Sequence, residues 1–344
     1  MLQPRLDDPF HLTACLTESC NLHCIHCYTD CNRADRVPDL SPQEWRAVVD
    51  DALEAGVIKV FFEGGEPLLR PDFLPLLEHT ARRALVYVRT NGTLVTEKVA
   101  AALKRCGAGT VCVDILGATA ATHDTMTGVP GSFDLACAAV GHLLRADLPV
   151  IMTIIPNRKN VAELQAYLEL AAALGVAKVS FLRLYPLGRA KRRWPELALT
   201  VQEMMSAIAA LRKPPGLQLM HSWHPNDANC CWQSAAVRAD GQSIGCPYLR
   251  EYVDFGNVRE TPFHETWNHP QHRSLRTTPI DPHCPDCSAT QLSSGGCRAM
   301  AYAFTGRFDA PDPLCPKQNN GIDFRELPSR LLAEIPVDPG TPGT

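Results

Sequence analysis

The sequence predicts an α/β protein, with a partial (β/α)6 barrel similar to a TIM barrel followed by a small loop-rich domain. Between about residues 10 and 190, short apolar runs alternate with longer amphipathic ones, the pattern of a parallel sheet with helical crossovers. After about residue 215 the helical periodicity fades, and glycine, proline and cysteine become frequent. We therefore expect the barrel in residues 1–215, the loop-rich domain in 216–327 and a disordered tail in 328–344.

Each expected strand is a short apolar run. The six candidates are His11–Leu16, Ile58–Glu63, Leu85–Thr90, Thr110–Ile115, Pro149–Ile155 and Lys178–Leu184. Helices are expected between them, at Ser41–Ala55, Asp72–Arg83, Val95–Cys106, Phe133–Ala146 and Val161–Leu174. The first begins with Ser-Pro and a glutamate three residues after the serine, which predicts a capping box. Six such repeats with right-handed crossovers give a closed or nearly closed barrel, whose chemistry lies at the carboxyl ends of the strands.

Composition excludes several classes of protein. The chain has 344 residues, 45% of them hydrophobic, and a net charge of −4. Because no basic stripe is present, we expect no nucleic-acid partner. No run approaches the roughly 18 apolar residues of a membrane span, and the N-terminus has no hydrophobic signal core. We expect a cytoplasmic protein without a membrane partner.

The cysteine content is unusual. Fifteen cysteines in a long chain without a signal peptide do not fit a disulfide framework, and the count is odd. In a reducing compartment, cysteines at short fixed spacings are typical of metal or cluster ligands. The sequence therefore favours metal chemistry.

The first cysteine group directly follows the first expected strand. Cys20, Cys24 and Cys27 fall within eight residues, so three thiolates can hold three irons of a cubane cluster. The fourth iron then has no protein ligand at this spacing and is open to a small molecule, like the open position of a catalytic zinc site. The alternatives are a zinc site completed by His23 or His26, or a buried structural group.

This C-x3-C-x2-C pattern resembles the signature of the radical S-adenosylmethionine superfamily. The resemblance implies that the open iron of a [4Fe-4S] cluster chelates S-adenosylmethionine, whose one-electron reduction gives a 5′-deoxyadenosyl radical that abstracts hydrogen from substrate. Two further segments support it: Gly64-Gly65-Glu66-Pro67 resembles the G-G-E-P motif, and Thr90-Asn91 resembles the segment near the cofactor's ribose. Two glycines also allow close approach of the backbone to a ligand.

The loop at 117–131 and the sixth-strand segment also resemble the family, but the match has departures. Asp114 lies where relatives carry a serine, and Thr127-Gly128 stands where Arg-Gly is common. The resemblance assigns Asp114 to cofactor binding but leaves the cofactor's carboxylate without its usual contacts. Arg183 is the candidate cation for that carboxylate.

The second cysteine group resembles the SPASM extension of this superfamily, which usually holds two auxiliary clusters. The matching residues are Cys231-x9-Gly241-x4-Cys246, Cys284-x2-Cys287, Cys297 and Cys315. The third cysteine of the central run is replaced by Ser293, and a Cys230-Cys231 doublet stands where one cysteine is usual. The second domain is thus expected to be a small loop-rich Fe–S cluster domain.

Carried over residue by residue, one auxiliary cluster takes Cys246, Cys297 and either Cys230 or Cys231. The other takes Cys284, Cys287 and Cys315, so one or two auxiliary clusters assemble. The alternative is a zinc knuckle at Cys284-Pro-Asp-Cys287.

Catalytic groups are less clear from the sequence. The spare thiol of Cys230 or Cys231 is a candidate hydrogen donor for an epimerisation, and Asp227, with His221 and His224, is a candidate base by position. The remaining cysteines at 15, 106, 112 and 137 are expected in the core, and the role of Cys31 is left open.

Three functions follow. The first is a radical oxidoreductase that modifies a peptide, in which an auxiliary cluster accepts the electron left after hydrogen abstraction. Its partners are an electron donor such as flavodoxin or ferredoxin and, since the motif begins at residue 20, a separate peptide-recognition protein. The second is a small-molecule dehydrogenase or epimerase acting on an aminosugar or tetrapyrrole, with the basic run at 189–194 near an acidic substrate. The third is a zinc-stabilised binding protein without enzymatic activity.

Overall fold

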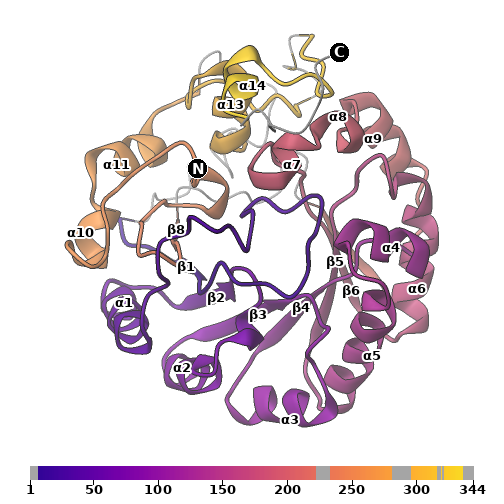
Figure 1. The fold of residues 1–344 in the computed structure, drawn as a ribbon, viewed down its shortest axis with the longest axis horizontal. Helices are drawn as coiled ribbons and strands as arrows, with labels where there is room; N and C mark the ends of the chain where they lie inside the picture. The colour runs from indigo at the N-terminus through magenta and orange to yellow at the C-terminus, as the bar shows by residue number, and fades with distance from the viewer. Residues whose placement is uncertain (1–6, 222–232, 281–295, 316–318, 320, 336–344) are drawn as a thin grey trace.

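A computed structural model describes residues 7–221, 233–280, 296–315, 319 and 321–335. Its central feature is an eight-stranded sheet in the order β7-β6-β5-β4-β3-β2-β1-β8, in which every neighbouring pair is parallel (Figure 1). The strands are β1 (His11–Cys15), β2 (Lys59–Glu63), β3 (Leu85–Thr90), β4 (Thr110–Asp114), β5 (Val150–Ile154), β6 (Lys178–Phe181), β7 (Gln218–His221) and β8 (Ser234–Val237). All six predicted strands are confirmed.

Helices cover the outer face of this sheet and connect its strands (Figure 1). The helices are α1 (Pro42–Glu54), α2 (Phe73–Ala81), α3 (Glu97–Arg105), α4 (Ala120–Thr127), α5 (Ser132–Arg145), α6 (Leu164–Ala173), α7 (Gly188–Arg192), α8 (Trp194–Leu197), α9 (Val201–Ala209), α10 (Phe263–Trp267), α11 (Pro270–Thr277), α13 (Arg298–Thr305) and α14 (Ser329–Ala333), with 3-10 turns η1 (Pro67–Leu69), η2 (Val161–Glu163) and η3 (Pro247–Leu249). The capping box predicted for α1 is present: the Ser41 hydroxyl accepts from the Glu44 N–H, and the Glu44 carboxylate accepts from the Ser41 N–H. The segment 117–131, expected as a loop, contains α4.

The sheet is open in the described part of the chain, because β7 and β8 lie at its two edges. Both strands lie beyond residue 215 and were not expected. Each has only four residues. Runs this short carry little periodic signal, and only pairing with β6 and β1 makes them strands. The chain that follows the predicted barrel therefore contributes both edge strands to its sheet.

Beyond β8 the chain packs beside β1 and over the carboxyl edge of the sheet, where α13 and α14 lie above α7 and α8 (Figure 1). The expected disordered tail does not begin at residue 328. Residues 329–333 form α14, and Leu331 is fully buried in the main core. Burial of this leucine offsets part of the entropy lost when this short helix is ordered. No helix among the described residues is long and apolar enough to cross a membrane.

Candidate functional site

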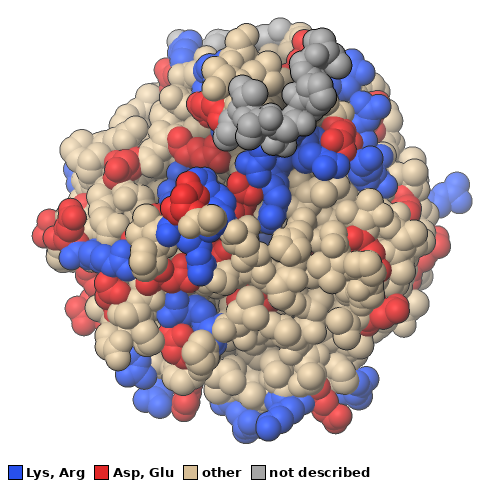
Figure 2. All heavy atoms as spheres, viewed as in Figure 1, with Lys and Arg blue, Asp and Glu red and all other residues tan. Residues whose placement is uncertain are grey.

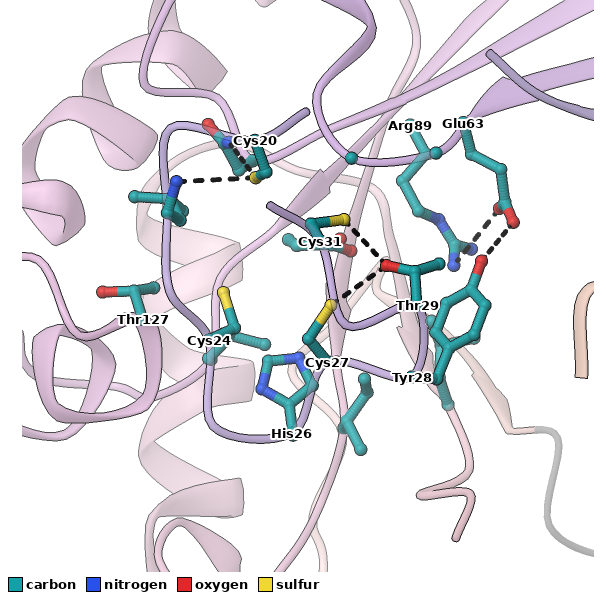
Figure 3. A pocket seen from close by; sticks show the side chains of 18 of the residues that line it. Cys20, Cys24, His26, Cys27, Tyr28, Thr29, Cys31, Glu63, Arg89 and Thr127 are labelled. Atoms are coloured by element: carbon teal, nitrogen blue, oxygen red, sulfur yellow. Dashed lines mark hydrogen bonds and ion pairs between the residues drawn. The ribbon is translucent and has the colours of Figure 1, made fainter. Parts of the chain in front are cut away.

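A cavity opens at the carboxyl edge of the sheet, where a barrel of this kind is expected to carry its chemistry. The volume of this cavity is about 100 Å³. The residues that line it come from the loop after β1, the segments at the ends of β2 to β6, the end of α4 and one residue of the C-terminal segment, Tyr248. Cys20, Cys24 and Cys27 all face this cavity (Figure 3).

The loop that carries these cysteines is held by the glycine pair after β2. The Gly65 N–H donates to the Thr17 carbonyl at 2.6 Å, and the Glu66 N–H donates to the Ser19 carbonyl at 2.9 Å. A Cβ on Gly64 would lie 2.6 Å from the Thr17 carbonyl oxygen, and one on Gly65 would overlap the Ser19 carbonyl. The two glycines thus allow close approach of backbone to backbone, and this fixes the start of the cysteine loop.

Three other elements hold the same loop. The Asn91 amide donates to the Asn21 side chain at 2.9 Å and lies 3.9 Å from the Cys20 sulfur. The backbone N–H of His23 donates to the carbonyl of Thr127 at the end of α4. From α7, the Arg189 N–H donates to the Cys27 carbonyl. Contacts from β3, α4 and α7 therefore set the positions of the three thiols.

The thiols differ in their electrostatic surroundings. Burial raises the pKa of Cys20 to about 11 and raises the pKa of Cys24 well above its ordinary value. Hydrogen bonding with Cys31 lowers the pKa of Cys27, and the Thr29 hydroxyl lies 3.1 Å from the Cys27 sulfur and 2.8 Å from the Cys31 sulfur (Figure 3). The sequence left the role of Cys31 open. In the structure Cys31 is buried and lines the cavity.

The donor set fits a cubane cluster. In the part of the chain that the structure describes, no three Cys, His, Asp or Glu side chains converge as they do around a single metal ion. A cubane binds each thiolate through a different iron, so its ligands lie farther apart than those of one ion. Burial lowers the pKa of His26 to about 4, and its Nδ1 has no hydrogen-bond partner among described residues. Cys20, Cys24 and Cys27 would hold the cluster, which supplies the electron for cofactor cleavage.

Glu66 and Pro67 lie behind the cavity wall instead of lining it. The Glu66 carboxylate is fully buried and accepts from the Thr90 hydroxyl, from the Asn91 N–H at 2.9 Å and from the Leu68 N–H at 3.1 Å. Burial raises the pKa of Glu66 to about 7. This carboxylate braces the Thr90-Asn91 turn, which does line the cavity together with Gly64 and Gly65.

The two departures from the family pattern both line the cavity. Asp114 ends β4, faces the cavity and accepts a hydrogen bond from the Thr153 hydroxyl. Burial raises the pKa of Asp114. Thr127 is also buried, and its hydroxyl contacts the Ser132 hydroxyl at 2.7 Å.

Arg183 lines the cavity but is engaged elsewhere. Its Nη1 lies 2.5 Å from the Asp312 Oδ2, and both side chains are almost completely buried. Desolvation opposes the charge of Arg183, but the adjacent Asp312 carboxylate raises its pKa. The proposed cation for the cofactor's carboxylate is therefore already paired with a carboxylate of the C-terminal segment.

Sequence reasoning missed several polar groups of the cavity wall, among them Tyr28, Glu63, Arg89, Tyr185 and Tyr248. The Tyr28 hydroxyl donates to Glu63 at 2.7 Å, and the Arg89 guanidinium lies 3.8 Å from the same carboxylate (Figure 3). Glu63 and Arg89 occupy the last inward-facing positions of β2 and β3. A charged residue at such a position in each strand is the sequence feature that could have predicted them as cavity residues. Nothing in the sequence placed Tyr248 there.

The basic run at 189–194 is neutralised in the fold. Arg192 pairs with Asp30 at 2.8 Å and Lys191 with Glu334 at 2.8 Å. Figure 2 shows basic and acidic side chains close together on this face of the molecule. The run is therefore not an exposed basic patch for an acidic substrate.

Part of the predicted auxiliary site is described. Cys246, Cys297 and Cys315 are buried or half-buried, and the backbone N–H groups of Cys297 and Cys315 both donate to Asp312. The other candidates lie outside the described residues: Asp227, Cys230, Cys231, Cys284, Cys287, Ser293 and His224. Of the cysteines expected in the core, Cys15 and Cys112 are buried, whereas Cys106 and Cys137 are partly exposed.

Known proteins resemble this chain over most of its length. The family model of the radical SAM superfamily matches residues 15–171. The model of the SPASM iron–sulfur cluster-binding domain matches residues 230–288. Mycofactocin maturase MftC of Mycobacterium tuberculosis is 32% identical over 90% of this chain and 83% of its own length. AdoMet-dependent heme synthase of Methanosarcina barkeri is 29% identical over 87% of this chain and 94% of its own length.

The fold is also that of a solved structure, Streptococcus suis SuiB bound to S-adenosylmethionine. The two structures superpose with a TM-score of 0.71 at 14% sequence identity. The match covers 90% of this chain and 78% of the SuiB chain. The family matches imply a [4Fe-4S] cluster, S-adenosylmethionine and auxiliary iron–sulfur clusters as cofactors. This chain belongs to the radical SAM superfamily of enzymes and carries a C-terminal SPASM domain.

Proposed function

We propose that this enzyme cleaves S-adenosylmethionine reductively and uses the 5′-deoxyadenosyl radical to abstract hydrogen from a C–H bond of a peptide. The observation that carries the proposal is the cavity at the carboxyl edge of the sheet, onto which all three ligand cysteines open. Among the relatives, mycofactocin maturase and the PqqA peptide cyclase of Gluconobacter oxydans are 32% and 29% identical to this chain. Their names support a peptide substrate.

The cavity has two sides that suit cofactor and substrate separately. Cys24 packs against an apolar group of Leu116, Met126, Leu184 and Leu197. We assign the adenosine to this apolar side, near the Thr90-Asn91 turn. The opposite side carries Glu63 and its ion-pair and hydrogen-bond partners, so we assign it to the substrate.

We further infer that the reaction is a net oxidation. Once hydrogen is abstracted, the substrate radical becomes a closed-shell product by losing one electron and a proton. Cys297, a proposed ligand of the auxiliary cluster that would accept the electron, lies 3.5 Å from the cavity residue Tyr185. Glu63 is a buried carboxylate on the substrate side that can accept the accompanying proton. The proposal includes a flavodoxin or ferredoxin as electron donor and a separate peptide-recognition protein.

A second candidate is supported by a specific comparison. The heme synthase relatives match this chain over 87% of its length, which favours a tetrapyrrole substrate. The two candidates are separated by anaerobic assays in which either precursor peptides or tetrapyrroles are supplied with S-adenosylmethionine and a reductant. A peptide that raises 5′-deoxyadenosine release well above background supports the proposal. Stimulation by tetrapyrroles alone would overturn it.

The cluster assignment has its own test. Replacing Cys20, Cys24 and Cys27 together with alanine should remove about four irons per chain and abolish cofactor cleavage. Cys106, at the end of α3, is partly exposed and does not line the cavity, so Cys106→Ala is the matched control and should keep its iron. Unchanged iron in the triple variant would refute the assignment.

A further inference from the structure

The wall between the cavity and the C-terminal cysteines is formed by two stacked tyrosines. The rings of Tyr185 and Tyr248 lie 3.7 Å apart at an interplanar angle of 8°, and both line the cavity. Tyr248 follows Cys246 by two residues, and the hydroxyl of Tyr185 lies 3.5 Å from the sulfur of Cys297. The same tyrosine thus contacts the cavity on one side and a predicted auxiliary ligand on the other.

The contact between Tyr185 and Cys297 is buried and rigid. Tyr185 is 4% exposed and Cys297 is 1% exposed, so little water competes for the sulfur. Stacking on Tyr248 restricts the tyrosine ring. The hydroxyl of Tyr185 is therefore held against the sulfur of Cys297.

Asp312 fixes the cysteine side of the contact. Its Oδ2 accepts from the Cys297 N–H at 2.8 Å and from Arg183 at 2.5 Å, while its Oδ1 accepts from the Leu314 N–H at 3.0 Å. A Cβ on Gly296 would lie 2.5 Å from the Asp312 Cβ, so the turn before Cys297 packs directly on this aspartate. Arg183 and Tyr185 are two residues apart in one segment of the cavity wall and hold Cys297 from two directions.

We propose that Tyr185 donates a hydrogen bond to the thiolate of Cys297 and so tunes the auxiliary iron–sulfur cluster that Cys297 ligates. A ligating thiolate carries no proton, so the tyrosine hydroxyl is the donor. Hydrogen bonds to cluster sulfurs stabilise the more negative, reduced state and raise the reduction potential. In a buried site this effect is strong because water does not screen it. The inference rests on the proposed role of Cys297 as a ligand.

The function of this contact follows from its position. An auxiliary cluster with a raised potential accepts one electron from the substrate radical more readily, and Tyr185 is a cavity residue that also touches a cluster ligand. Arg183 is accordingly a positioning residue for Cys297, acting through Asp312.

The test is a potentiometric titration of the anaerobic holoenzyme followed by electron paramagnetic resonance. Tyr185→Phe should keep the iron content of the wild type and shift the midpoint of an auxiliary cluster to a more negative value. Tyr248→Phe is the matched control: it removes a hydroxyl from the same stack but leaves the contact between Tyr185 and Cys297 in place, so the midpoint should stay unchanged. A wild-type midpoint in Tyr185→Phe would overturn the inference.

Two further variants keep the test decisive. If Tyr185→Phe fails to retain its clusters, 3,5-difluorotyrosine at position 185 keeps the ring and makes the hydroxyl a stronger donor, so the midpoint should rise. An unshifted midpoint there would also contradict the proposal. Cys297→Ala tests the underlying assignment separately: loss of iron confirms Cys297 as a ligand, whereas full iron content refutes that assignment and the inference with it.

Discussion

Glu66 is a buried carboxylate whose ionisation is linked to folding. Its pKa rises from an ordinary value of 4.5 to about 7, chiefly because burial disfavours the charged form. The folded protein therefore holds a proton that the unfolded chain releases between about pH 4.5 and 7. The free energy of unfolding contributed by this group is fully present below that window and is lost as pH rises through it.

We predict that Glu66→Gln flattens this pH dependence. A shift of this size corresponds to about 3 kcal/mol, so the anaerobic unfolding temperature of the wild type should fall between pH 5 and 7.5 relative to that of the variant. The same slope in both proteins would show that Glu66 does not titrate in this range. Other groups also titrate, and the comparison between the two proteins cancels their contribution.

Single residues show where sequence patterns suffice. Spacing alone identified Cys20, Cys24 and Cys27, and all three reach one cavity because a short loop constrains them. Arg183 also lines that cavity, but its partner Asp312 is 129 residues away in the chain. No local pattern predicts a pair at such a separation.

The loop after β1 is an element with little regular structure whose shape is set by its neighbours. The turn at Gly64-Gly65 packs directly on residues 17–19, and the space for a Cβ at Gly65 is occupied by the carbonyl of Ser19. The Gly64-Gly65 pair therefore positions the cysteine loop and also lines the cavity.

We predict that Gly65→Ala displaces this loop and lowers the iron content by about four per chain, because Cys20 directly follows Ser19. Gly141→Ala is the matched control: Gly141 lies within α5, and an added Cβ meets only the flexible end of Arg145, at 3.1 Å. It should keep its iron and gain up to about 1 kcal/mol of stability from helix propensity. Iron analysis and thermal unfolding check both. Normal iron in Gly65→Ala would contradict the structural role of the glycine.

The elements up to the end of β6 were largely predictable. Strands β1 to β6 and helices α1, α2, α3, α5 and α6 follow from apolar periodicity and caps, because each buries one face in the same core. The four-residue strands β7 and β8, the helix α4 and every described helix from α7 onward were missed, since these short elements depend on neighbours distant in sequence.

On the scale of the whole molecule, the last described helix belongs to the core. Leu331 of α14 is fully buried, whereas the adjacent Leu332 is 51% exposed. We predict that Leu331→Ala costs about 2–5 kcal/mol, through lost burial and the cavity left behind. Leu332→Ala is the control and should change stability by less than about 0.5 kcal/mol. Anaerobic unfolding curves check both, and equal effects would mean that α14 does not pack as described.

The sequence by itself determined the chemistry of this protein and most of its sheet. A thiolate triplet at fixed spacing within one short loop, and helices and strands with a local apolar period, are properties of neighbouring residues. The tertiary structure decided what surrounds that chemistry: the pairing of Arg183 with Asp312, the tyrosine wall between the cavity and Cys297, and the two edge strands. These contacts join residues far apart in the chain, so only the packing of the folded molecule specifies them.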